Sequence, residues 1–456
     1  MKLRSASLAL AGSVILAACS DVPTSVVTTT PRAAKTSGSI GINVVLTGPI
    51  TDAARAQLSA YGRINDEVPE INALTMRIAA GDLAAVQALS VVAAAGPDAV
   101  RNGVPVDAVP SADFTTGIST WDLDAVNVTS GPGANKRTVA ETGDGVYVGI
   151  LDTGLLSSWR QYFPQERVAT EYARAFGGGG GDNGTVSEQP NKWQQDQNSH
   201  GTHVASSILG YQLGANTITG VAPMARVIPV KVLNQNGSGW SSTIARGIVY
   251  IADLKAGELA GHPMVINMSL GGGGPIDPME KAAIDFAITK GVIVVAAAGN
   301  SGNAGVESPG SYQPVISVAA TGWKQEFPAG NGQWWNNLDV PENDASQYFI
   351  ADFSSKVRSA SQDLDVAAPG QDVVGPYQVN SQISYYYLSG TSMSSPHVAG
   401  VVALMAQREP SLNASKAEEV LTRCAVAIPT VAATAQGSGI VLANRALAGL
   451  TSATCD

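Results

Sequence analysis

The stretch LSGTSMSSPHVAG, residues 388–400, sets a turn of small residues against the start of an apolar run. Ser392 follows Gly390 and Thr391, and residues 398–405 are mostly apolar. A serine at that junction either caps a helix or serves as a nucleophile at the positive end of a buried helix. The rest of the chain is needed to decide between these two interpretations.

Composition limits the classes of protein that the chain can form. Its 456 residues suffice for one large domain and a smaller one, and 45% hydrophobic with 14% charged residues is ordinary for a globular protein. The formal net charge of -10 disfavours binding to nucleic acid. We therefore expect a globular protein that does not bind nucleic acid; we also expect it to be a monomer.

The N-terminus has the pattern of an export signal. Lys2 and Arg4 precede a largely apolar stretch, residues 8–18, which is too short to span a membrane. Residues 16–19, LAAC, resemble the bacterial lipobox, in which the cysteine carries lipid; an ordinary cleavage site is the alternative. We therefore expect export, with lipid on Cys19 holding the precursor at the outer membrane or cell surface.

The chain has three cysteines, Cys19, Cys424 and Cys455. If lipid occupies the first, the other two can pair in the oxidising environment that export implies. A bridge between them would staple the C-terminal tail and contribute ~3–4 kcal/mol through loop entropy. Two free thiols are the alternative.

The first hundred residues divide by composition. Residues 1–18 form the expected export signal, and residues 19–38, rich in Ser, Thr, Pro and Val, are expected to be a linker. Residues 39–103 then alternate strand and helix patterns. The expected strands are residues 42–46, 72–79 and 91–100, and the expected helices are residues 51–61 and 82–90, the second capped by Asp82. This predicts a small α+β unit.

After Gly103 the composition turns polar, so we place a domain boundary there and assign residues 104–456 to a second, larger domain. Near-continuous apolar strands are expected at residues 146–151, 226–233, 264–270, 292–297 and 315–320. Helices are expected at residues 203–209, 241–254, 278–290 and 395–407. This pattern predicts an α/β fold whose parallel sheet is flanked by helices, with a ligand site at the carboxyl ends of the strands.

Three polar residues fit that edge. Asp152 ends a strand in YVGILDTG, His200 enters an apolar helix in NSHGTHVA, and Ser392 occupies the junction described above. Each alone has a simple alternative: a turn aspartate, a core or capping histidine, a capping serine. A metal pair of His200 and His203 is a weak alternative because no HExxH pattern is present. Together the three residues supply carboxylate, base and nucleophile.

A fourth stretch, GVIVVAAAGNSG, is a buried strand that runs into Asn300. Its amide could donate to a developing oxyanion, with the backbone N–H of Ser392 as the second donor. A left-handed turn residue before Gly302 is the alternative.

With these residues in place, the chain resembles the subtilisin-like serine proteases, the subtilase family. The motifs that carry the resemblance are LDTG at 151–154, HGTHVA at 200–205, GVAP at 220–223, SLGG at 269–272, AAGN at 297–300, DVAAPG at 365–370 and GTSMSSPHVAG at 390–400. The resemblance implies an exported serine endopeptidase that acts on protein or peptide substrates through an acyl-enzyme. It assigns Asp152, His200 and Ser392 to the catalytic triad and Asn300 to the oxyanion site.

The resemblance also implies how substrates and regulation are arranged. It gives two edges that pair with an extended substrate, namely Gly237, Ser238 and Gly239, and Ser269, Leu270 and Gly271. A plain glycine turn is the alternative for both. Residues 39–103 correspond to a ferredoxin-like inhibitory propeptide, so the enzyme would be made as a self-inhibited precursor. The chemistry needs no cofactor; structural calcium is an expectation of the family, although the sequence has no clear cluster of carboxylate ligands.

Some features depart from the family or extend it. The stretch from Asp152 to His200 and residues 323–350, with Trp323, Trp334 and Trp335, resemble insertions. These aromatic residues either pack their loop or bind substrate. Glu307 precedes Ser308-Pro309, where the family builds its primary specificity pocket; we hypothesise a preference for basic residues at the cleavage position, against a solvated loop glutamate.

Two other functions are weighed against a protease. A catalytically silent binding scaffold conflicts with the intact set of catalytic residues. A lipase would need a G-x-S-x-G elbow, and Ser392 lies in G-T-S-M-S.

Overall fold

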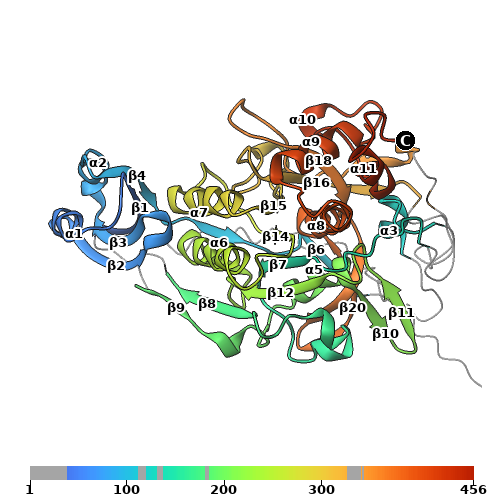
Figure 1. The fold of residues 1–456 in the computed structure, drawn as a ribbon, viewed down its shortest axis with the longest axis horizontal. Coiled ribbons are helices and arrows are strands. Elements are labelled where there is room, and N and C mark those ends of the chain that lie inside the picture. Colours follow the sequence, from blue (N-terminus) through green and yellow to red (C-terminus); the bar gives the residue numbers. More distant parts are fainter. Residues whose placement is uncertain (1–37, 111–119, 131–136, 180–183, 326–339, 341–343) are drawn as a thin grey trace, which may run out of the picture. The chain divides into compact units, whose positions relative to one another are not determined.

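The computed structural model describes residues 38–110, 120–130, 137–179, 184–325, 340 and 344–456 (Figure 1). The expected export signal, Cys19 and almost all of the expected linker lie outside these residues, as do Trp334 and Trp335. In the part of the chain described, no helix is both long and apolar enough to cross a membrane.

The N-terminal unit, blue in Figure 1, is a four-stranded sheet with two helices. Its elements are β1 Ser39–Leu46, α1 Asp52–Ser59, β2 Gly62–Val68, β3 Ala73–Ala79, α2 Leu83–Gln87 and β4 Val92–Pro97. The strands pair antiparallel in the order β2-β3-β1-β4. This βαββαβ arrangement is the expected ferredoxin-like fold.

Two details of this unit differ from the sequence prediction. Strand β2 was not predicted, because its sequence GRINDEV is polar and a bulge between Ile64 and Asp66 breaks the alternation of its side chains. The cap by Asp82 was wrong, since its side chain makes no capping bond. A 3-10 turn, Ala80–Asp82, already holds Asp82 in a helical conformation, whereas a capping side chain needs an extended backbone.

The second region is built on a nine-stranded sheet in the order β17-β16-β15-β14-β7-β12-β8-β9, with β18 also pairing with β16. Its central strands are β7 Tyr147–Asp152, β12 Arg226–Lys231, β14 Met264–Met268, β15 Val292–Ala297 and β16 Ile316–Trp323. These five run parallel, as the apolar sequence runs predicted, and the antiparallel pairs lie at the sheet ends.

Helices cover both faces of this sheet. In β7, Val148 and Ile150 belong to one buried cluster with α5 His200–Leu209 and α8 Thr391–Arg408, whereas Leu151 belongs to another with α6 Ser241–Ala256 and α7 Pro278–Thr289. Trp323 is also buried in the first cluster, so it packs the core. Helices α5 and α8 begin three and four residues earlier than predicted, and each therefore includes a proposed catalytic residue.

The remaining elements complete this region. They are β5 Val100–Asn102, β6 Asp107–Pro110, α3 Trp121–Ala125, β8 Arg174–Gly178, β9 Val186–Glu188, β10 Gly210–Leu213, β11 Asn216–Thr219, β13 Ser238–Trp240, β17 Tyr348–Ile350, β18 Val366–Pro369, β19 Val373–Val379, β20 Gln382–Ser389, α9 Ala414–Cys424, α10 Ala433–Gln436 and α11 Ala443–Gly449.

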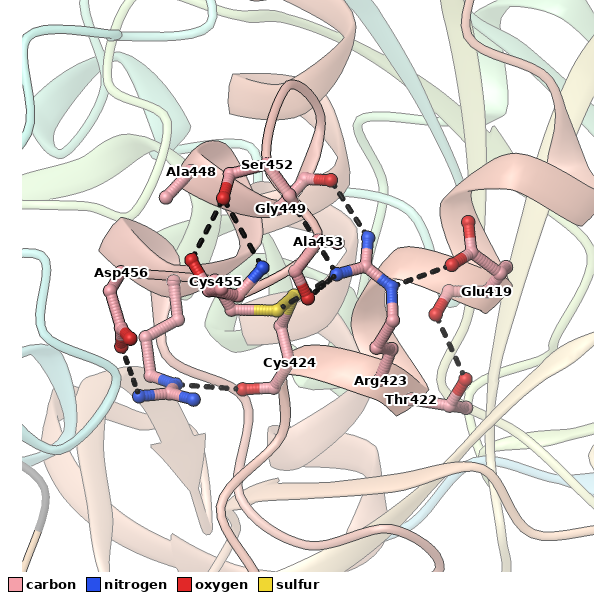
Figure 2. The surroundings of a disulfide bond; sticks show 12 residues. Glu419, Thr422, Arg423, Cys424, Ala448, Gly449, Ser452, Ala453, Cys455 and Asp456 are labelled. Carbon is pink, nitrogen blue, oxygen red and sulfur yellow. Dashed lines mark hydrogen bonds and ion pairs between the residues drawn. A yellow bond between two sulfur atoms is a disulfide. The ribbon is translucent and has the colours of Figure 1, made fainter.

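A disulfide joins Cys424, at the end of α9, to Cys455 near the C-terminus (Figure 2). The guanidinium of Arg423 donates to the carbonyl oxygens of Gly449, Ser452 and Ala453. The C-terminal tail is thus held by one covalent bond and by several hydrogen bonds from a single side chain.

Candidate active site

Asp152 is the last residue of β7 and is fully buried at the carboxyl end of the sheet. The backbone N–H of Thr153 donates to its Oδ1 over 2.6 Å. Gly154, which completes the turn, has a φ of 92°, and a Cβ there would lie 2.3 Å from the carbonyl oxygen of Trp193. The LDTG sequence therefore needs glycine at its fourth position.

His200 is the first residue of α5, and its Nδ1 lies 2.9 and 3.0 Å from the two carboxylate oxygens of Asp152. A Cβ on Gly201 would lie 2.3 Å from the carbonyl oxygen of Gly154, which explains the glycine after the histidine. In the tautomer that this contact favours, Nδ1–H donates to the carboxylate and Nε2 is left as an acceptor. Nε2 has no hydrogen-bond partner among the residues that the structure describes.

His203, considered in the sequence as a second ligand of a metal pair, lies in the core. Its Nε2–H donates to the carbonyl oxygen of Val373 over 3.1 Å. Burial lowers the pKa of His203 to about 3, so it is a neutral core residue. A metal site with His200 is not supported.

Ser392 is the second residue of α8 and is nearly buried, with 3% of its surface exposed. Its hydroxyl donates to the carbonyl oxygen of Ser269 over 3.1 Å. In enzymes without substrate, the bond from nucleophile to base is often long or misaligned and tightens only when substrate binds.

Helix α8 passes through Pro396, which has no N–H to bond the carbonyl oxygen of Ser392. The hydroxyl of Ser269 donates to that oxygen instead, over 2.7 Å. The same hydroxyl accepts from the side-chain amide of Asn267 over 2.9 Å. Ser269 therefore anchors the first turn of α8, a role that the sequence analysis missed because it placed Ser269 only on a substrate-binding edge.

Asn300 lies just after β15 and faces the start of α8. Its Oδ1 accepts from the N–H of Thr391 over 2.9 Å and from the Thr391 hydroxyl over 3.0 Å, which fixes the orientation of the amide. A Cβ built on Gly390 would lie 3.5 Å from Asn300 Nδ2 and 3.7 Å from the backbone nitrogen of Ser392. Two nitrogen atoms that carry N–H groups therefore lie close to one small region, and an oxyanion site needs two such donors.

The two proposed substrate edges hold a segment of the chain itself. Strand β5 pairs antiparallel with β13, and Asn102 exchanges two backbone hydrogen bonds of 2.8 Å with Gly271. The N–H of Gly103 donates to the carbonyl oxygen of Gly237 over 2.8 Å, and a Cβ on Gly103 would lie 3.5 Å from Cε1 of His200. An extended segment therefore runs between both edges towards His200.

Glu307 lies beside one of these edges. A Cβ on Gly271 would lie 3.0 Å from its Oε2, and a Cβ on Gly299 would lie 2.5 Å from its Cγ and Cδ. The Ser301 hydroxyl donates to its carboxylate, and the side chain is only partly buried. Glu307 thus occupies the space between the Gly271 edge and the strand end that carries Asn300.

Three carboxylates could hold a metal ion in the part of the chain described: Asp363, Asp365 and Glu418, with ligand oxygens within 4.8 Å of one another. Burial, together with the smaller effect of the charges of Asp363 and Glu418, raises the pKa of Asp365 to about 8. Oxygen donors of this kind suit calcium, which subtilases commonly bind. The sequence did not predict this carboxylate cluster because Glu418 comes from a separate helix, α9.

Comparison with known proteins agrees with this geometry. The model of the subtilase family matches residues 143–444. The chain is 34% identical over 330 residues to Subtilisin Savinase of Lederbergia lenta, covering 72% of this chain and 97% of that protein. It is 33% identical over 328 residues to the Thermostable alkaline protease of Halalkalibacterium halodurans, covering 72% and 73%. Among solved structures it is similar to the S41 psychrophilic protease, with a TM-score of 0.53, 28% identity and coverage of 72% of this chain and 99% of that one. The chain therefore belongs to the subtilase family of serine endopeptidases.

Proposed function

We propose that Asp152, His200 and Ser392 hydrolyse peptide bonds through an acyl-enzyme. His200 Nε2 takes the hydroxyl proton as Ser392 Oγ attacks the carbonyl carbon, and the imidazolium then protonates the leaving amine. Water enters with His200 as base and releases the acyl group. Asn300 Nδ2 and the N–H of Ser392 stabilise the oxyanion. The observation that carries the proposal is the buried His200–Asp152 pair, whose ring lies near the carbonyl oxygen that accepts from Ser392. A Cβ built on Gly103 would lie 3.5 Å from His200 Cε1 and 2.7 Å from that Ser269 oxygen. A silent binding scaffold is not retained, because the family match supports an enzyme.

A serine-directed covalent inhibitor tests the nucleophile. We expect mass spectrometry to find one adduct, on Ser392, in the wild type and none there in Ser392→Ala. Ser359→Ala, a change on the exposed surface, is the matched control and should label like the wild type. Equal labelling of Ser392→Ala would contradict the assignment.

The chain is further proposed to be a self-inhibited precursor in which residues 39–103 are the propeptide. Support comes from β5, which lies between the two substrate edges and leads to His200. Wild type and Ser392→Ala, expressed side by side, distinguish the outcomes by intact mass. If only the wild type shortens to a chain that begins near residues 100–120, the precursor cuts itself. Equal shortening of both would mean that another protease matures it.

Export and lipid attachment at Cys19 complete the proposal. The lipid would sit on the propeptide side of the cut, so maturation would also release the catalytic domain from its anchor to the extracellular or periplasmic space. Fractionation tests this: we expect lipid-labelled precursor in the membrane fraction and the mature enzyme in the soluble fraction. Mature enzyme that stays with the membrane would argue against release.

Glu307 is proposed to favour substrates with a basic residue at the cleavage position. Its partly exposed carboxylate next to Gly271 would pair with an arginine side chain that enters between the groove edge and Asn300. Kinetics on matched Arg, Phe and Glu peptides would show the highest kcat/KM for Arg, and Glu307→Gln should remove that preference. Equal preference in Glu307→Gln and wild type would reject the role.

A further inference from the structure

We propose that Asp196 is a positioning residue for the catalytic pair, acting through the hydroxyl of Thr153 on the first turn of α5. The inference rests on the function proposed above, because it concerns how His200 is held against Asp152. Asp196 lies in the loop before α5, on no element that the sequence singled out.

The hydrogen bonds of Asp196 join the two segments that carry the proposed catalytic pair. Its side chain is buried, and Oδ2 accepts from the Thr153 hydroxyl over 2.9 Å. Its Oδ1 accepts from the N–H of Asn198 over 2.9 Å, and its own N–H donates to the carbonyl oxygen of Leu155 over 3.1 Å. The carboxylate is therefore fixed between the turn after β7 and the loop that leads into His200.

The Thr153 hydroxyl donates one hydrogen bond and accepts another. A hydroxyl has one proton, and because Thr153 gives it to Asp196, its lone pairs are left to accept. The N–H of Gly201 donates to this oxygen over 2.9 Å. Thr153 follows Asp152 and Gly201 follows His200, so the chain of bonds from Asp196 joins the residue after the acid to the residue after the base.

The charges around Asp196 support an ionised acceptor in the working enzyme. Lys231 is the neighbouring cation, and its ammonium donates to the carbonyl oxygen of Thr153 over 2.5 Å. Tyr377 also interacts with the Asp196 charge. Asp152 and His200 are one residue away from Thr153 and Gly201, which the chain of bonds from Asp196 joins. Burial raises the pKa of Asp196 to about 6, so at pH 7 and above the carboxylate is mostly charged and only accepts hydrogen bonds.

The test compares Asp196→Ala, Asp196→Asn and Thr153→Val, with rates expressed per active site titrated by the serine-directed inhibitor. Loss of a hydrogen bond to a charged group predicts a fall in kcat of about 10- to 100-fold for Asp196→Ala, with KM nearly unchanged. Asp196→Asn keeps an acceptor for Thr153 and should recover much of the rate. Thr153→Val should match Asp196→Ala, and the double variant should add little, because both act through one link.

The pH profile gives a readout that a purely structural role would not move. Asp196→Asn removes a negative charge near His200, so the acid limb of the kcat/KM profile should shift to lower pH. A kcat within about twofold of the wild type for Asp196→Ala, losses that multiply in the double variant, or an unmoved profile would overturn the proposal. If the inhibitor fails to label Ser392 in the wild type, the proposed function itself fails, and that outcome is distinct.

Discussion

At the scale of single residues, Asn300 has two separable tasks. Its Oδ1 holds Thr391 at the start of α8, and its Nδ2 is the proposed oxyanion donor. Removing such a side-chain donor in a subtilisin lowers turnover ~100- to 1,000-fold, and we expect that range for Asn300→Ala in peptide hydrolysis assays. Asn300→Asp keeps the acceptor for Thr391 but removes the donor, so it should lose as much. Asn303→Ala, a change on the exposed surface nearby, should leave the turnover unchanged.

A substitution at Gly390 probes the same proposed oxyanion site without removing either donor. The nearest neighbours of an added Cβ lie 3.5 to 3.7 Å away, which is ordinary contact, so Gly390→Ala should fold normally. The methyl group would nevertheless approach the place where both donors meet the oxyanion, and misplacement of reacting groups by about 1 Å can cost on the order of 100-fold in rate. We expect a large fall in kcat with an unchanged melting temperature; unchanged kcat would place the oxyanion elsewhere.

At the scale of elements, the Cys424–Cys455 bond ties the end of α9 to the C-terminal tail. The bridged residues are 31 positions apart, so opening the loop should lower the free energy of unfolding by roughly 3–4 kcal/mol. Urea unfolding of the paired Cys424→Ser and Cys455→Ser change, made in Ser392→Ala to prevent self-digestion, measures this. The parent protein under reductant is the matched control. An unchanged midpoint in both would show that the contacts of Arg423 hold the tail alone.

At the scale of the whole molecule, a buried polar cluster joins the N-terminal unit to α6 and α7. The amide nitrogen of Asn43 lies 3.1 Å from an Asp98 carboxylate oxygen and 2.9 Å from one of Asp277. Asp98 also accepts from the N–H of Ser242, at the start of α6, over 3.1 Å. Two carboxylates, one on each side of the contact, therefore share a single amide.

An ion pair completes this cluster. Arg101 and Glu280, both fully buried, lie 2.7 Å apart and connect β5 to α7. The titratable groups that interact here are Asp98, Asp277, Glu280 and Arg101, and the cation pairs with Glu280. Burial, then the charges of Asp98 and Glu280, raise the pKa of Asp277 to about 7.

Because the pKa of Asp277 is raised, the contact between the N-terminal unit and α7 weakens as the pH rises. The assembled form keeps a proton on Asp277 that the separated form, with an ordinary carboxyl pKa, has lost. The extra stability of the contact is therefore fully present below about pH 4 and is lost as pH rises to about 7. We expect the cleaved propeptide to leave the catalytic domain faster at pH 8 than at pH 5.

Release can be measured after the proposed self-cleavage by incubating the wild type at several pH values and assaying aliquots at one common pH. Asp277→Asn, which cannot titrate, should flatten the dependence. Asp285→Asn, on the same helix but near the surface, should leave it unchanged. Equal pH dependence in Asp277→Asn and wild type would assign the effect to another group.

Features of this protein that depend on neighbouring residues in the chain can be predicted from the sequence, whereas contacts between distant residues cannot. Central strands of the large sheet and the positions of Asp152, His200 and Ser392 could be predicted from the sequence. Buried parallel strands need long apolar runs, and the close backbone contacts at Gly154 and Gly201 exclude any side chain, so both are visible in the sequence.

Only the tertiary structure decided the contacts between distant segments. The anchoring of Ser392 by Ser269, the link from Asp196 to Gly201 through Thr153, and the acids that meet at Asp277 join residues far apart in the chain. A hydroxyl or carboxylate has no periodic pattern of its own, and its partner is set by how sheets and helices pack. The sequence by itself therefore determined which residues could perform the chemistry, and the packing of distant elements decided how they are held, because burial and hydrogen bonding depend on the folded surroundings.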